Sequence, residues 1–216
     1  MGSQNFYIDD LVMDRMLQGS DYAYEIYEAQ RIEVVLGRSS NIEEDVMTDT
    51  CAEDGIPVSR RRGGGGTVVL SPGTVILSIA GRSSLQYHLR EHMNAVNTII
   101  IDTLKQLGVN SLFIRGTSDI TLGMKKILGS SLYRRKDLLL YQGSLLVNPD
   151  LNIIKRYLKQ PRKQPRYRKH RPHEDFVTSL YNEGYAIPMA VIINSFQSAL
   201  TSVSPWPPVL PSALQS

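Results

Sequence analysis

One long amphipathic segment, surrounded by paired β-like segments, most constrains the fold. Residues 85–107 carry apolar side chains three or four positions apart, which places them on one face of a helix. These side chains are Leu89, Met93, Val96, Ile100, Leu104 and Leu107. The predicted strands come in adjacent pairs, which favours antiparallel pairing over a doubly wound parallel sheet. We expect an α/β fold of the α+β type, with a mixed, mostly antiparallel sheet and helices packed against it.

Shorter patterns divide the rest of the chain. Helical periodicity occurs at residues 5–17, 151–158, 175–180 and 188–200, and residues 41–53 have helical possibilities. Strands are predicted at residues 22–29, 32–36, 111–115, 126–128 and 138–147. Residues 58–80 are typical of a β-hairpin, with strands at 67–70 and 74–80 joined by a Ser-Pro-Gly turn. We expect one domain over residues 1–203 and a proline-rich tail over residues 204–216.

The composition is that of an ordinary globular protein. The chain has 216 residues, of which 42% are apolar and 21% charged, and this excludes a disordered or fibrous chain. No stretch approaches the roughly 18 unbroken apolar residues of a membrane span, and the start does not resemble a secretory signal. A single cysteine, Cys51, allows neither an internal disulfide nor a cysteine-based metal cluster. A cytoplasmic protein without membrane contact is the simplest interpretation.

The basic residues are concentrated in one segment. Residues 155–171 hold nine Lys or Arg and no acid, whereas the whole chain has a net charge of only +3, so the remainder is acidic. Such a segment can dock an acidic partner, contact phosphates, or simply be a solvated loop. Its two aromatics, Tyr157 and Tyr167, are too few to indicate nucleic-acid binding.

A run of arginines and glycines is the first candidate binding element. Residues 60–66 read Arg-Arg-Arg-Gly-Gly-Gly-Gly. Glycines let a ligand approach the backbone closely, successive N–H groups can bind an anion, and arginines bind phosphates. β-forming residues follow the run, so it matches neither a P-loop nor a dinucleotide-binding turn. A flexible surface turn is the alternative.

Two adjacent lysines are the second candidate. Lys125 and Lys126 lie in the glycine-bounded segment 119–131. Neighbouring strand residues point to opposite faces, so one ammonium can meet an anionic intermediate while the other is solvated. An ordinary exposed lysine pair is the alternative. His88 and His92 are spaced for a metal, but no third ligand is evident. We therefore expect surface histidines and no metal site.

Four segments together resemble the lipoate-protein ligases, which share a fold with biotin ligases and octanoyltransferases. Residues 37–41 resemble G-R-x-Q-N, and residues 55–68 resemble G-I-P-V-x-R-R-x-[ST]-G-G-G-A-V. Residues 119–131 resemble the D-[LI]…G-K-K-I-x-G-S segment, and residues 142–151 resemble H-G-T-L-L-x-N-x-D-L. The segments follow one another in the family's order. The resemblance implies a class II synthetase-like biotin/lipoate ligase catalytic domain.

The resemblance also implies roles for single residues. Lys126 would bind the acyl carbonyl and phosphate oxygens, Arg61 would contact the phosphate of an acyl-adenylate, and Asp119 would orient the nucleotide or the incoming acceptor lysine. The remaining implied substrate-binding positions pack against the acyl chain or line the same cleft. They are Gly64, Gly65, Gly66, Thr67, Gly129, Ser130 and Gly143.

The implied function is an ATP-dependent ligase that activates lipoate or octanoate as acyl-AMP, with Mg²⁺ bridging the ATP phosphates. The implied acceptors are the lipoyl-bearing domains of 2-oxoacid dehydrogenase acyltransferase subunits or of the glycine-cleavage H protein. A separate accessory chain would replace the C-terminal domain that typical bacterial ligases carry.

Several positions depart from the family pattern. Gly63 stands where the family has Ser or Thr, Gln142 replaces a histidine, and Leu70 and Ser71 replace further polar residues. An ATP-independent octanoyl or lipoyl transferase and a non-catalytic acyl-adenylate-binding homologue are therefore kept as alternatives. The cysteine of related octanoyltransferases has no counterpart in residues 114–118, and Cys51 lies in an acidic region that disfavours a thiolate.

Overall fold

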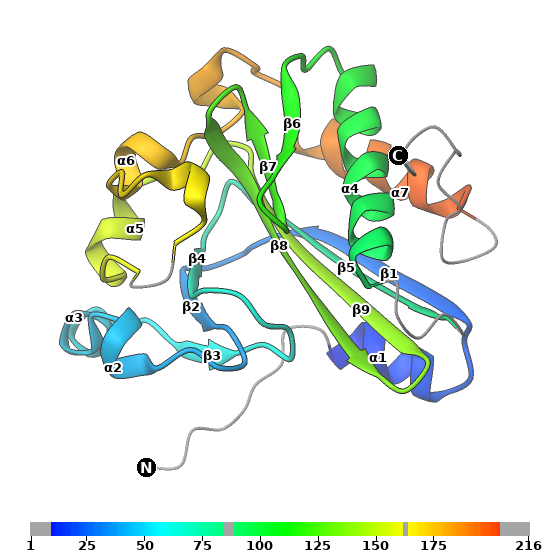
Figure 1. The fold of residues 1–216 in the computed structure, drawn as a ribbon, viewed down its shortest axis with the longest axis horizontal. Helices are drawn as coiled ribbons and strands as arrows, with labels where there is room; N and C mark the ends of the chain where they lie inside the picture. The colour runs from blue at the N-terminus through cyan, green and yellow to red at the C-terminus, as the bar shows by residue number, and fades with distance from the viewer. Residues whose placement is uncertain (1–9, 84–88, 162–163, 204–216) are drawn as a thin grey trace.

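A six-stranded antiparallel sheet forms the centre of the molecule (Figure 1). The computed structural model describes residues 10–83, 89–161 and 164–203. The strand order is β1-β5-β9-β8-β7-β6, and every neighbouring pair is antiparallel. The strands are β1 (Tyr22–Glu28), β5 (Thr74–Arg82), β6 (Leu112–Arg115), β7 (Asp119–Leu122), β8 (Lys125–Arg135) and β9 (Leu138–Leu146).

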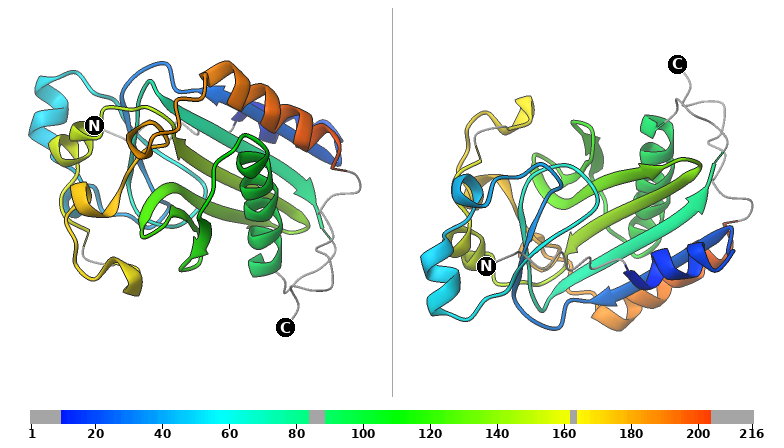
Figure 2. Two further views of the ribbon diagram at one scale, coloured as in Figure 1. Left: turned by 90° about the horizontal axis from the view of Figure 1, so that it is seen from above. Right: turned by 90° about the horizontal axis from the view of Figure 1, so that it is seen from below.

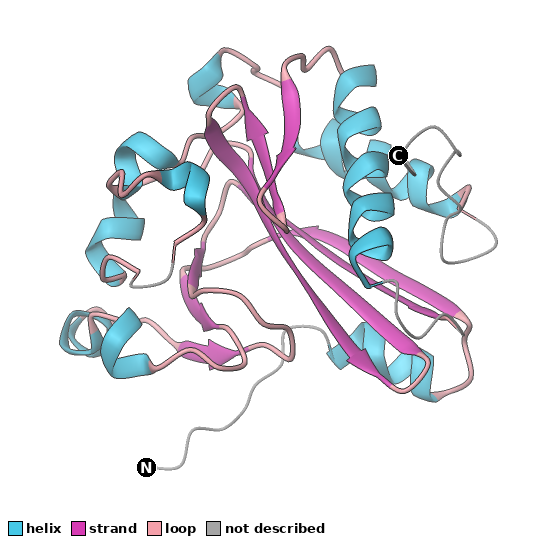
Figure 3. Ribbon diagram, in the orientation of Figure 1, coloured by secondary structure: helices cyan, strands magenta, loops and turns pink. Residues whose placement is uncertain are grey.

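A second, three-stranded sheet lies beside the first (Figure 3). Its central strand β2 (Glu33–Leu36) pairs parallel with β3 (Val58–Arg60) and antiparallel with β4 (Val68–Leu70). The helices α2 (Ile42–Asp45), α3 (Thr48–Glu53) and α5 (Asn152–Tyr157) contribute to the small core of this sheet or flank it. The predicted mixed, mostly antiparallel α+β architecture is thus confirmed.

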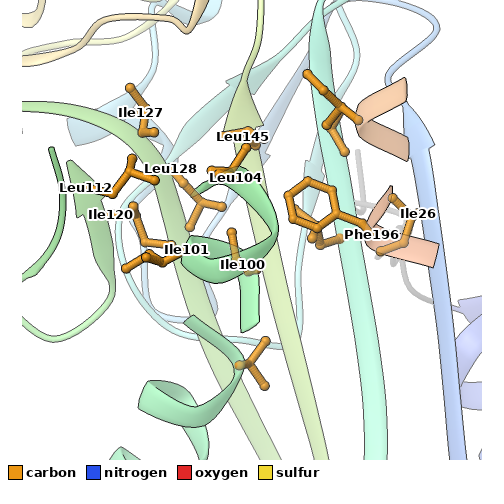
Figure 4. Packing of buried hydrophobic residues seen from close by; sticks show 14 of the residues in the cluster. Ile26, Ile100, Ile101, Leu104, Leu112, Ile120, Ile127, Leu128, Leu145 and Phe196 are labelled. Atoms are coloured by element: carbon orange, nitrogen blue, oxygen red, sulfur yellow. The ribbon is translucent and has the colours of Figure 1, made fainter. Parts of the chain in front are cut away.

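The main core lies between the large sheet and two helices, α4 (Leu89–Gln106) and α7 (Met189–Thr201) (Figure 4). Inward-facing side chains of β5, β8 and β9 meet Val96, Ile100 and Leu104 of α4 and Phe196 of α7. The prediction for α4 is confirmed in type and position, although residues 84–88 lie outside the described part. Leu89 is an exception, because it is 40% exposed in the first described turn and does not belong to the core.

The opposite face of the large sheet is covered in part by α1 (Asp10–Leu17). Val12, Met13 and Met16 pack against alternate residues of the sheet. Figure 2 shows α1 and α7 running beside the edge strand β1. No helix in the described part of the chain is long and apolar enough to cross a membrane.

The predicted hairpin over residues 58–80 is wrong. Strand β4 belongs to the small sheet and β5 to the large one, so the two strands do not pair. Gly73 explains the redirection, because its φ is +87° and a β-carbon there would collide with the backbone of Asn148. This close approach takes the chain from one sheet to the other within a few residues.

The helix predicted at residues 175–180 is also wrong. The helix α6 (His173–Phe176) ends before Val177, which forms a parallel bridge with Lys126, and Thr178 N–H donates to the Lys126 carbonyl at 2.9 Å. Two single-turn helices complete the elements, η1 (Arg166–Arg168) and η2 (Tyr181–Glu183). The proposed tail, residues 204–216, lies outside the described residues, and the domain division stays a prediction.

Candidate active site

An ion pair between neighbouring strands forms the centre of the site. Lys126 Nζ on β8 lies 2.7 Å from Asp119 Oδ1 at the start of β7. The second oxygen of this carboxylate accepts a hydrogen bond from the Tyr167 hydroxyl at 2.6 Å. Asp119 is buried, whereas a quarter of the Lys126 side chain is exposed. The Lys126 ammonium is therefore held by Asp119, whose second oxygen is bonded to Tyr167, while part of the lysine side chain remains accessible.

Gly129 makes room for the ammonium. Asp119 and Gly129 are register partners, and a β-carbon on Gly129 would lie 2.7 Å from Lys126 Nζ. Lys125 lies elsewhere, 3.6 Å from Glu183 Oε1 and about half exposed. The adjacent lysines thus have different surroundings, as strand geometry predicts. A register shift between Ile120 and Thr121 interrupts the β7–β8 ladder beside the pair.

The glycine run forms a loop whose shape Arg61 fixes. This side chain is buried, and its guanidinium donates to the carbonyls of Gly64 and Gly66 at 2.6 and 2.7 Å. Burial lowers the pKa of the Arg61 guanidinium to about 10, which leaves it charged at neutral pH. Gly65 has a φ of +86°, which a side chain would strain. The predicted phosphate contact of Arg61 stays a prediction, because the described bonds go to the backbone.

The first and second family-like segments meet at this loop. Arg38 N–H donates to the Gly63 carbonyl at 2.9 Å, and a β-carbon on Gly37 would collide with the Gly65 carbonyl oxygen. Arg60 donates to three carbonyls of residues 37–40. Thr67, at the end of the loop, donates to Asp45 Oδ2 at 2.7 Å. The two segments therefore form one packed unit.

The loop lies over the β8–β9 part of the large sheet. A β-carbon on Gly63 would collide with Ser131 Oγ and would lie 3.2 Å from Gln142 Oε1. Ser131 comes two residues after Gly129, so both point to the same face of the sheet. The glycine loop and the lysine–aspartate pair thus share one face.

Ser130 and Gly143 belong to the other face. Ser130 Oγ donates to the Ser118 carbonyl at 2.8 Å and lies 3.2 Å from Met93 Sδ on α4. A β-carbon on Gly143 would lie 3.1 Å from the Tyr141 ring, on the side of the main core. Their predicted place in the substrate cleft remains untested.

Tyr167 is a site residue that the pattern analysis missed. It lies 48 positions from Asp119, and only the fold brings the two together. Burial, together with the Asp119 charge, raises the pKa of the Tyr167 phenol well above its ordinary value. Its ring packs 5.2 Å from Phe176, over which the Arg168 guanidinium also stacks. The basic segment is therefore anchored directly on the candidate catalytic pair.

Other candidate groups are not arranged for chemistry. Cys51 is a buried free thiol whose pKa is raised by burial and by Asp54. His92 is buried and lies 3.1 Å from Ser83 Oγ, so the expectation of a surface histidine is wrong there; His88 lies outside the described residues. Across the described residues, no three His, Cys, Asp or Glu side chains gather into a possible metal site.

One lysine and a glycine loop thus share one face of the large sheet. The sequence profile of the lipoyl protein ligase A/B catalytic domain matches residues 2–201, and the chain belongs to this family. Lipoate–protein ligase 1 of Plasmodium falciparum is 31% identical over 125 residues, which cover 58% of this chain and 29% of that protein. Lipoate-protein ligase A subunit 1 of Thermoplasma acidophilum is 30% identical over 137 residues, which cover 59% of this chain and 52% of that protein.

Solved structures show the same fold. The bipartite lipoate protein ligase of Thermoplasma acidophilum superposes with a TM-score of 0.76 at 23% identity, over 89% of this chain and 75% of that one. A lipoate-protein ligase A with bound ATP gives a TM-score of 0.75 at 22% identity, over 89% and 76% of the two chains. The chain spans between about a third and a half of the length of the curated relatives it matches.

Proposed function

We propose that the chain is an ATP-dependent lipoate-protein ligase, which activates lipoate or octanoate as acyl-AMP and transfers the acyl group to a lysine of an acceptor domain. The observation that carries this proposal is the Lys126 ammonium, held by Asp119 over Gly129 on the sheet face that the glycine loop covers. Membership of the lipoyl ligase family supports the choice of substrate.

The proposed chemistry needs a stabilised oxyanion and no protein nucleophile. A free carboxylate is a poor acyl donor, because its leaving group would be an oxide. In the mixed anhydride with AMP, the acceptor amine forms a new C–N bond, AMP leaves with the electrons of the broken C–O bond, and the nitrogen loses a proton. Negative charge develops on the acyl oxygen meanwhile, and a preorganised ammonium stabilises it. Lys126 would supply that charge.

The surrounding residues would keep this ammonium in place. Asp119 holds Nζ, and the Tyr167 hydroxyl holds Asp119, so the pair need not reorganise as charge develops. Arg61 would act mainly by fixing the glycine loop, whose backbone N–H groups would face the adenylate phosphate.

ATP and lipoate are proposed as substrates, and bound ATP and bound lipoic acid occur in structures of related ligases. Among the described residues, no three His, Cys, Asp or Glu side chains gather into a site that could hold a metal by themselves. The proposed Mg²⁺ would therefore accompany ATP and take most of its ligands from the phosphates and water.

The proposed partners are lipoyl-acceptor domains, namely those of 2-oxoacid dehydrogenase acyltransferase subunits or the glycine-cleavage H protein. The Thermoplasma relative is described as a bipartite ligase with an E2 lipoyl domain. A separate accessory chain is proposed here by analogy with it.

The test supplies the acyl group in three forms to a purified acceptor domain and reads the acceptor mass. Lipoate with ATP and Mg²⁺ tests the whole reaction, preformed lipoyl-AMP tests transfer alone, and an octanoyl thioester tests the ATP-independent route. We expect modification in the first two arms. Modification from the thioester alone would favour the transferase, and adenylate binding without modification in any arm would favour a non-catalytic homologue.

A further inference from the structure

Three polar side chains form a row across adjacent strands of the large sheet. Ser131 on β8 is the register partner of Gln142 on β9, which is in turn the partner of Ser78 on β5. Register partners on neighbouring strands point to the same face. The three residues are 6%, 6% and 2% exposed, respectively.

The row lacks hydrogen-bond partners. Among the described residues, no partner is found for Ser131 Oγ, for Ser78 Oγ or for either amide atom of Gln142. Most buried polar atoms in proteins are paired, because leaving one unpaired forfeits its hydration without return. A ligand that can donate and accept hydrogen bonds would satisfy these four neighbouring atoms.

The row lies at a definite position relative to the catalytic lysine. Ser131 is two residues beyond Gly129, over which the Lys126 ammonium lies, and two residues of a strand span roughly 7 Å. An acid whose carboxyl group binds at Lys126 would reach the row after about five carbon–carbon bonds of ~1.5 Å. In lipoate, the carbon that carries the first sulfur stands at that distance from the carboxyl carbon.

The glycine loop covers the row but forms no described hydrogen bond with its polar atoms. Gly63 packs so closely that a β-carbon there would meet Ser131 and Gln142, and no described hydrogen bond joins the loop to the row. A serine or threonine at position 63 would therefore not fit above these side chains. Gly63 and Gln142, which both differ from the family pattern, lie close together, so the two differences are structurally linked.

We propose that Ser78, Gln142 and Ser131 form a hydrogen-bonding subsite for the distal part of the acyl donor. The subsite selects a carboxylic acid with hydrogen-bonding atoms at that position over an all-carbon chain of the same length. Lipoate, whose sulfurs are weak acceptors, is therefore preferred over octanoate. This inference rests on the proposed function, since it needs the carboxyl group at Lys126.

The test is calorimetric titration of the full chain with three acids: octanoate, lipoate, and octanoate hydroxylated at the carbon that carries the first sulfur in lipoate. The wild type should bind the hydroxylated acid most tightly and octanoate least, with about tenfold between the extremes, since one or two net hydrogen bonds are gained. Gln142→Leu should reduce this ratio to about one, and Ser131→Ala should reduce it in part. Gln197→Leu, on the exposed side of α7, is the matched control and should leave the ratio unchanged.

Each outcome decides between the two proposals. If the acids bind but the hydroxylated acid binds no better than octanoate, or if Gln142→Leu leaves the ratio unchanged, the subsite is wrong and the proposed function stands. If no acid binds to the wild type, both proposals fail. Melting curves guard against misfolding, and Gln142→Leu should not lower the melting temperature, because it removes two unpaired buried atoms.

Discussion

The ammonium of Lys126 occupies the space that Gly129 leaves by having no side chain. A β-carbon at Gly129 would lie 2.7 Å from Nζ and 2.9 Å from Cε of this lysine. Both residues belong to the same family-like segment, three positions apart on β8. The glycine is thus required by the lysine rather than by the backbone, because no positive φ is recorded for it.

Gly129→Ala tests this relationship. The colliding atoms are the mobile end of a lysine side chain, so the fold should survive while the ammonium is displaced. A misplacement of about 1 Å can cost about 10² in rate, and we expect a loss of that order in acyl transfer. Alanine in a strand is no worse than glycine for stability. The backbone gain opposes the weakening of the ion pair with buried Asp119, so the melting temperature should change little. Unchanged transfer would show that the ammonium has no fixed position.

Tyr167→Phe tests the support behind Asp119. The variant loses the 2.6 Å hydrogen bond but retains the ring that packs on Phe176. One hydrogen bond is worth about 0.5–1.5 kcal/mol net, so transfer should fall about two- to tenfold and the melting temperature should fall by a few degrees at most. Tyr181→Phe, on an exposed tyrosine, is the control. Equal transfer rates for both variants would show that the Tyr167 hydroxyl does not support Asp119 in the reaction.

The pH dependence gives a second measurement on Tyr167. Burial and the Asp119 charge raise the pKa of this phenol, which keeps its proton where an ordinary tyrosine, with a pKa of about 10, begins to ionise. The rate ratio of wild type to Tyr167→Phe should therefore stay constant up to about pH 10. A ratio that falls as the pH approaches about 10 would indicate an ordinary, exposed phenol.

The basic segment, residues 155–171, is proposed to dock an acidic acceptor domain. Some of its cations are already engaged, because Arg156 forms a two-bond pair with Asp54 and Arg168 is buried. Arg166 and Lys169 are exposed and available. Changing both to Glu should raise the apparent KM for the acceptor severalfold at low salt, and the effect should shrink as salt screens the charges.

A charge-matched variant separates docking from net charge. Arg90→Glu with Arg135→Glu makes the same change at exposed positions outside the basic segment. It should leave the acceptor KM nearly unchanged. If the two double variants behave alike, overall charge rather than a docking surface controls the encounter.

Local periodicity predicted those parts of the fold that depend on neighbouring residues. The helix α4 was predictable because its buried side chains repeat every three or four positions. Strand alternation indicated that only one of Lys125 and Lys126 faces the site, and the family resemblance selected Lys126. The hairpin at residues 58–80 failed because strand pairing depends on distant partners. A turn with Pro72 and Gly73 serves equally well to leave one sheet for another.

Site residues were predictable only where they lie together in one continuous segment of the sequence. The glycine loop and Lys126 are each local, whereas the Tyr167–Asp119 bond and the row of Ser78, Gln142 and Ser131 join separate strands and loops. Ser130 is a further case, because strand alternation turns it towards α4 although its neighbour Gly129 faces the lysine. That a residue belongs to a family motif therefore does not show to which face of the sheet its side chain points.

The most direct test of the central claim compares Lys126→Ala with Lys125→Ala, using preformed lipoyl-AMP, an acceptor domain and detection by mass spectrometry. Loss of one preorganised donor costs about 10²–10³ in rate, roughly 2.7–4 kcal/mol, so Lys126→Ala should lose that much while Lys125→Ala loses little. Lys126→Arg should not restore the rate, because a planar guanidinium differs in shape from an ammonium. Transfer at the wild-type rate by Lys126→Ala would contradict the account.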